Sequence, residues 1–103
     1  MTQRIYRSQG VSSKIRASDL SSLDSNITNV LEGHMPLNGK AIKVLIIECD
    51  RPVPRTKLTF VNPEYIAGLK QELGPLEKMI GKPVRVYFTG MPFNINYGIS
   101  AKY

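Results

Sequence analysis

The chain has 103 residues, the size of one ordinary domain, and its 42% hydrophobic and 21% charged residues exclude wholesale disorder. Its formal net charge of +6 favours an anionic partner such as nucleic acid or an acidic protein surface. One cysteine, Cys49, and one histidine, His34, exclude an internal disulfide and a His/Cys zinc site within the chain. The N-terminus lacks a signal-peptide pattern, and no apolar run reaches the length of a membrane span. We therefore expect a cytoplasmic protein with no membrane partner.

Residues 1–17 are expected to form a basic N-terminal arm or a short edge strand, ahead of one α+β domain over residues 18–103. This arm holds 4 basic residues and no acidic residue, so much of the positive charge lies there. The first helix is predicted over residues 18–33, because the apolar side chains recur at helical spacing. These side chains are Leu20, Leu23, Ile27, Val30 and Leu31.

The middle of the chain predicts a central β-hairpin. Residues 40–49 are rich in β-branched residues and apolar on both faces, which is typical of a strand inside a sheet. Residues 50–55, with the sequence DRPVPR, form a stiff loop because two prolines fix the backbone, and residues 56–61 resume as a strand.

A second helix is predicted to begin at Asn62-Pro63, a good cap followed by a good first helical residue. Gly74-Pro75 interrupts its apolar stripe, so the helix either kinks there or ends at Leu73 and restarts. Two strands follow. Residues 83–89 alternate, with Arg85 and Tyr87 pointing outward, and residues 95–101 are expected as the last strand, at an edge of the sheet.

These elements predict an α+β fold in which an antiparallel sheet of four to five strands is packed by two helices. The order is (β)-α-β-β-α-β-β, which is ferredoxin-like in its first six elements if the N-terminal strand forms. The alternative is a small OB-like barrel, because a helix also precedes the fourth strand of that fold. The long helix expected over residues 18–33 argues against this alternative.

No catalytic or metal-binding arrangement is favoured. Cys49 is expected to be buried in a strand and His34 to lie in a loop, so a Cys–His nucleophile is not indicated. Glu48 and Asp50 can share a strand face, but Arg51 and Arg55 nearby suggest ion pairing instead of a metal. We expect a protein that is not an enzyme and has no cofactor.

Basic and aromatic residues gather on the predicted sheet face, the hairpin and the arm. Single-stranded nucleic acid is bound by such faces, because bases stack on rings while cations follow the phosphates. The sequence therefore predicts a small basic binding module for nucleic acid. Its predicted contact residues are Arg4, Arg7, Lys43, Arg51, Arg55, Lys57, Arg85 and Tyr87.

The alternative function is a protein-interaction or assembly module. It would use the exposed edge of the last strand and the apolar residues Met35, Met91 and Phe93 in predicted loops, and its partner could be a second copy of the chain.

One segment resembles a known family. Residues 78–100 are similar to the C-terminal part of the small phycobilisome core-linker family, over about a quarter of the chain, and no functional residue follows from it. The matching residues are Met79, Gly81, Lys82, Val84, Val86, Thr89, Gly90 and Pro92.

Overall fold

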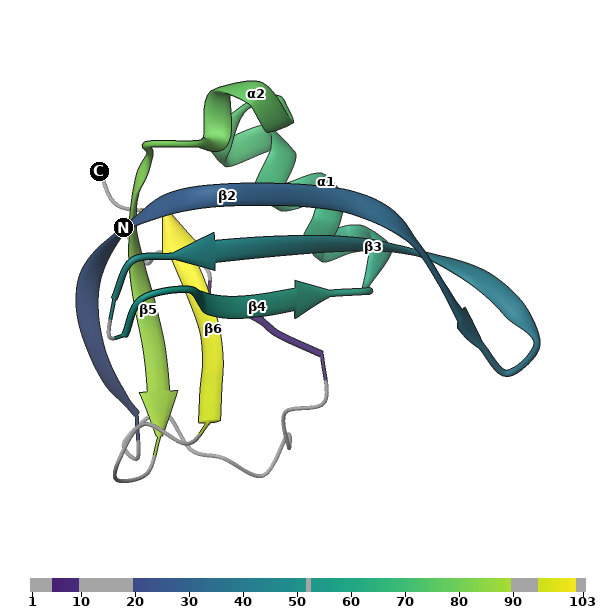
Figure 1. Ribbon diagram of the computed structural model, residues 1–103, viewed down its shortest axis with the longest axis horizontal. Helices are drawn as coiled ribbons and strands as arrows, with labels where there is room; N and C mark the ends of the chain where they lie inside the picture. The colour runs from purple at the N-terminus through teal and green to yellow at the C-terminus, as the bar shows by residue number, and fades with distance from the viewer. Residues whose placement is uncertain (1–4, 10–19, 52, 90–94, 102–103) are drawn as a thin grey trace.

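The structure, a computed structural model, describes residues 5–9, 20–51, 53–89 and 95–101. Within these ranges, six strands form one sheet in the order β1-β6-β5-β2-β3-β4, with every neighbouring pair antiparallel (Figure 1). The strands are β1 (Tyr6–Arg7), β2 (Ser21–Leu37), β3 (Lys40–Cys49), β4 (Thr56–Phe60), β5 (Pro83–Thr89) and β6 (Ile95–Ala101). Two short helices, α1 (Pro63–Leu73) and α2 (Leu76–Met79), lie between β4 and β5.

The longest element is β2, and it belongs to both halves of the sheet. Its first part, Ser21 to Asn26, pairs with β5, and its second part, Ile27 to Leu37, pairs with β3. Figure 1 shows β2 bending between these two parts, so that β5 and β6 cross behind β3 and β4. The strand therefore takes the place of the helix expected over residues 18–33, and that prediction is wrong.

A bulge in β2 explains why its sequence looks helical. Leu23 and Ile27 face the interior, and the register then shifts between Ile27 and Asn29, so that Val30 is the next residue opposite a buried partner. A bulge inserts one residue and moves the inward position from two residues away to three. The inward apolar residues consequently recur at intervals of four and three, which is the spacing of a helix face.

The turn between β2 and β3 is a two-residue β-hairpin turn at Asn38 and Gly39. Both residues have positive φ angles, 52° and 77°. This is the backbone of a tight hairpin turn, for which Asn-Gly is the preferred sequence. Beyond the end of β4, the two strands continue as a projecting hairpin that Figure 1 shows reaching away from the helices. We call residues 31–46 the hairpin arm; they comprise this projection and, at its base, the two β2–β3 pairs that lie beside the end of β4.

The second helix is confirmed, and the structure decides between its two expected forms. Asn62 caps α1 with a 2.9 Å hydrogen bond from the Glu64 N–H to Oδ1, and Pro63 is the first helical residue. The helix ends at Leu73, because Gly74 has a φ of 90°, and α2 follows as one separate turn. Neither helix has the length and apolarity needed to cross a bilayer.

The short strand β1 joins the two ends of the curled sheet. It pairs with β6, and after it the Gln9 N–H donates to the carbonyl of Thr59 on β4 at 2.5 Å. Tyr6 is 2% exposed, donates its hydroxyl proton to Glu72 of α1 and meets the Tyr65 ring edge-to-face. Part of the predicted basic arm is therefore a strand that is anchored in the core.

The fold predicted from the sequence is wrong in its layout. Among the described residues the sheet has six strands and both short helices come from one connection, which does not match a ferredoxin-like order with two packing helices. The strands predicted from Lys40 onward are confirmed, although β6 is covered by β1 and is not an edge. The helix expected over residues 18–33 is the argument against an OB-like barrel. Residues 21–37 form a strand, so that argument does not apply.

Candidate nucleic-acid interface

The eight predicted nucleic-acid contacts do not form one cluster. Arg4 lies outside the described residues. Three lie on the outer face of the sheet (Arg7, Tyr87 and Arg85), three at the β3–β4 end (Arg51, Arg55 and Lys57), and Lys43 lies beside α1.

Arg7, Tyr87 and Arg85 form what we call the basic sheet face. Arg7 and Tyr87 are each directly opposite Gly98 of β6, so all three residues lie in one row across β1, β6 and β5. Neighbouring strands lie about 4.8 Å apart, which places the Arg7 and Tyr87 backbones about 10 Å apart. Gly98 itself is buried, because the backbone of β1 occupies the position that a side chain there would take. Arg85 lies two residues from Tyr87 on the same face.

Neighbouring polar groups hold this face in place. The Tyr87 and Ser100 hydroxyl oxygens are 3.1 Å apart, and this hydrogen bond fixes the end of the tyrosine ring. Arg85 donates to Asp24 at 3.4 Å, in a salt bridge whose side chains are 44% and 52% exposed. Such exposed pairs contribute little and exchange readily with other anions, so Arg85 stays accessible to a phosphate.

The β3–β4 loop is fastened to the bend of β2 by Ser25. The Ser25 hydroxyl donates to Asp50 at 2.8 Å and accepts the Arg51 N–H at 3.1 Å. The backbone N–H of Asn26 also donates to Asp50, and these bonds hold the pKa of Asp50 below its ordinary value. Asp50 therefore fastens the loop to β2 through Ser25 and Asn26. Arg51 and Arg55 are exposed.

Lys57 and Lys43 do not join the basic sheet face. Lys57 is directly opposite Glu48, which supplies a counter-charge on the outer side of β4. Lys43 lies 3.3 Å from Glu32, next to α1.

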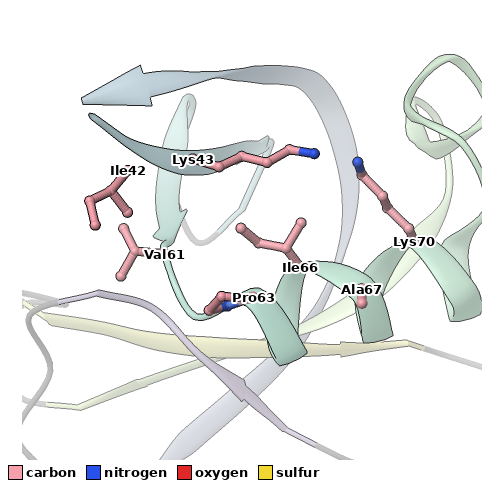
Figure 2. Close-up of a pocket in the computed structure, with 7 residues that line it drawn as sticks. All are labelled: Ile42, Lys43, Val61, Pro63, Ile66, Ala67 and Lys70. Atoms are coloured by element: carbon pink, nitrogen blue, oxygen red, sulfur yellow. The ribbon is translucent and has the colours of Figure 1, made fainter. Parts of the chain in front are cut away.

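Lys43 and Lys70 flank a cleft between the base of the hairpin arm and α1 (Figure 2). Its volume is about 270 Å³, and we call it the lysine cleft. Figure 2 shows the two ammonium groups turned toward each other above Ile66. Its lining is Ile42, Lys43, Val61, Pro63, Ile66, Ala67 and Lys70.

Both ammonium groups of the cleft bind one oxygen, Oε2 of Glu32. The distances are 2.6 Å from Lys70 and 3.3 Å from Lys43. The hydrogen bond that Lys70 donates, followed by the one from Lys43, lowers the pKa of Glu32. The bond between Lys70 and Glu32 also raises the pKa of Lys70. With two ammonium groups and one carboxylate, the group has one formal positive charge in excess.

Cys49 and His34 are far apart. Cys49 is on β3, and His34, on β2, lies opposite Lys43 of β3. Cys49 and Lys43 are six residues apart along β3, which corresponds to about 20 Å. Cys49 is fully buried, and burial raises the pKa of its thiol to about 12. The structure brings no Cys–His pair together, and no group of three metal-binding side chains occurs among the described residues. That the protein is not an enzyme stays a prediction.

The hairpin arm carries an apolar outer face that the sequence did not reveal. Leu31, Met35 and Leu37 lie opposite Ile46, Ile42 and Lys40, so these side chains share one face of a two-stranded ribbon. Leu31 is 52% and Leu37 40% exposed. The alternation of this segment is visible in the sequence only once it is known to be a strand. Met91 and Phe93, predicted with Met35 as interaction residues, lie outside the described residues.

Compared with known protein families, curated proteins and solved structures, the chain matches none of them. The similarity of residues 78–100 to the core-linker family thus stays a resemblance of one segment.

Proposed function

We propose that the protein is a cytoplasmic binding module for single-stranded nucleic acid and that the basic sheet face is its contact surface. The observation that carries this proposal is the row from Arg7 through Gly98 to Tyr87, with Arg85 beside it. Tyr87 is half-buried and its hydroxyl is bonded, so its ring is held in place for a base to stack on. Arg7 and Arg85 lie on either side of this ring and supply the cations that bind phosphates.

The net charge of the chain supports the same proposal. A formal charge of +6 attracts a polyanion over distances longer than any single contact. Arg51 and Arg55, exposed in the β3–β4 loop, contribute two cations to this charge.

Fluorescence anisotropy with a labelled poly-dT oligonucleotide of about 20 nucleotides, and with a duplex of the same length, tests the proposal. We expect stronger binding of the single strand and a steep loss of affinity with salt. Arg7→Ala and Arg85→Ala should each reduce the slope of log K against log[salt] by roughly one unit. Tyr87→Ala should leave the slope unchanged and weaken binding by about 1–3 kcal/mol.

Lys78→Ala is the matched control, since Lys78 is an exposed cation on α2, outside the basic sheet face. It should change neither the affinity nor the slope beyond a small general effect of charge. Absence of binding at about 50 mM salt, where phosphate contacts are strong, would refute the proposal.

A second candidate function is self-assembly through the hairpin arm. The pairing of β2 with β5 ends at Asn26, so within the described residues the arm has one edge of β2 without a neighbouring strand. In a two-residue hairpin the residues that flank the turn exchange backbone hydrogen bonds. The backbone N–H and C=O groups of Leu37, and of every second residue before it, therefore point to β3. The backbone groups of Glu32 and His34 consequently point to the free edge.

A second copy of the chain fits this edge in an antiparallel arrangement with Gly33 on the two-fold axis. Glu32 then faces His34 of the second copy, and Leu31 faces its Met35. Such an interface brings the same strand edge of both copies together and joins the two apolar faces into one.

Sedimentation equilibrium tests self-assembly by comparing substitutions at two residues that are equally exposed. Leu31 and Ile80 are each 52% exposed, but only Leu31 lies on the hairpin arm. We expect a dimer that Leu31→Lys dissociates and Ile80→Lys leaves intact. A wild-type protein that stays monomeric at about 1 mM, a concentration at which even weak contacts form, contradicts the assembly.

A further inference from the structure

The lysine cleft combines an apolar floor with an incomplete set of charges. Ile66 forms the floor, and Val61 and Ala67 line its sides, whereas Lys43 and Lys70 stand at the opening (Figure 2). Two ammonium groups share one carboxylate oxygen of Glu32. A second anion placed between them would balance the remaining positive charge.

The size of the cleft limits what fits. A volume of 270 Å³ corresponds, at about 30 Å³ per water-sized unit, to a molecule of roughly nine non-hydrogen atoms. The apolar floor favours a hydrocarbon body, and burial of that body supplies the affinity. The paired ammonium groups favour a charged head at one end only, because the opposite end of the cleft is apolar.

We propose that the lysine cleft binds a small amphipathic monocarboxylate, with its carboxylate between Lys43 and Lys70 and its hydrocarbon part on Ile66 and Ala67. This site is separate from the basic sheet face, since it lies between α1 and the hairpin arm and uses none of Arg7, Tyr87 or Arg85. Its ligand is recognised by charge at the opening and by fit on the floor. Neither part alone is sufficient.

Octanoate, which has ten non-hydrogen atoms, is the probe, and octanamide is its uncharged analogue of the same shape. Acetate has the charged head without the hydrocarbon body. Titration followed by ¹H–¹⁵N NMR spectroscopy should show saturable shifts of the amides of Ile66, Ala67 and Lys70 with octanoate. For a ligand of this size, a Kd on the order of 0.1–1 mM is expected. Octanamide should bind at least about tenfold more weakly than octanoate, because it loses a charge-assisted contact. Acetate should bind more weakly by at least the same factor, because it has no hydrocarbon body to bury.

Two variants separate the head from the body of the ligand. Lys70→Met keeps the length of the side chain and the Lys43–Glu32 pair but removes one ammonium group. It should weaken octanoate at least about tenfold and leave octanamide unchanged. Ala67→Phe fills the cleft from an exposed helix position and should abolish binding of both probes.

Lys78→Met is the matched control, because it removes a lysine from α2, outside the cleft, and should not alter either titration. The inference is overturned if octanoate gives no saturable shifts at about 10 mM, far above the expected Kd. It is also overturned if octanamide binds as well as octanoate, or if Lys70→Met binds octanoate like the wild type. Oligonucleotide binding should be the same with and without octanoate, so failure of one proposal leaves the other testable.

Discussion

A single methyl group at Gly98 is expected to detach β1 from the sheet. A Cβ atom there would lie 2.2 Å from the carbonyl oxygen of Tyr6 and 2.9 Å from its carbonyl carbon. Both are backbone atoms, held by the antiparallel pairing in which Arg7 lies opposite Gly98. Backbone cannot rotate away as a side chain does, so we expect Gly98→Ala to break the β1–β6 pairing.

The cost follows from what β1 buries. Tyr6 is 2% exposed, and its ring lies 5.7 Å from that of Tyr65, at an interplanar angle of 82°. Burying a side chain of this size is worth about 1.5–3 kcal/mol, and an aromatic pair adds about 0.5–1.5 kcal/mol. We therefore expect Gly98→Ala to lower the free energy of unfolding in urea by about 2–4 kcal/mol.

Gly33→Ala is the matched control, because Gly33 also lies within a strand but a Cβ there meets nothing within 4 Å. This variant should be neutral or stabilised by about 0.5–1 kcal/mol through the loss of glycine flexibility. Tyr6→Ala provides a second check. Since both changes remove the same contacts, the double variant should be little less stable than either single one. Unchanged stability of Gly98→Ala, or additive effects in the double variant, would refute the reasoning.

Three further predictions concern the β3–β4 end of the sheet. Ser25→Ala should lower the free energy of unfolding by about 1–3 kcal/mol, because Asp50 and the Arg51 N–H each lose a hydrogen-bond partner. Urea denaturation measures this change, and an unchanged free energy of unfolding would contradict the prediction. The pKa of Asp50 is depressed in the folded protein, so its contribution is complete above its ordinary value of 3.8 and is lost as pH falls through the lower folded value. Acid unfolding should accordingly be less steep in Asp50→Asn than in the wild type, and equal slopes would argue against it. Because Cys49 is buried with a pKa of about 12, a disulfide reagent at about pH 8 should label it only as fast as the protein unfolds, whereas prompt labelling of the folded protein would show an accessible thiolate.

Local signals in the sequence were sufficient for the second half of the chain. Asn62-Pro63 marks the start of α1, and the alternation of residues 83–89 gives both the strand and its buried face, Val84, Val86 and Phe88. These features depend on capping chemistry and on two-residue periodicity, which act between neighbours in the chain. The outward direction of Arg85 and Tyr87 follows from the same periodicity, and in β5 Arg85 is exposed and Tyr87 half-buried.

Tertiary structure alone decided the role of β2 and the grouping of the surface residues. The bulge near Thr28 gives the inward side chains of β2 the spacing of a helix, and only pairing with β3 and β5 distinguishes the two. Arg7 and Tyr87 are 80 positions apart and become neighbours of Gly98 through the return of β1 to β6. The lysine cleft likewise needs Glu32, Lys43 and Lys70 from three elements. The sequence by itself determined which segments form regular structure from residue 40 onward and how charged the chain is. Which charges meet was decided by long-range strand pairing, because such contacts leave no periodic trace along the chain.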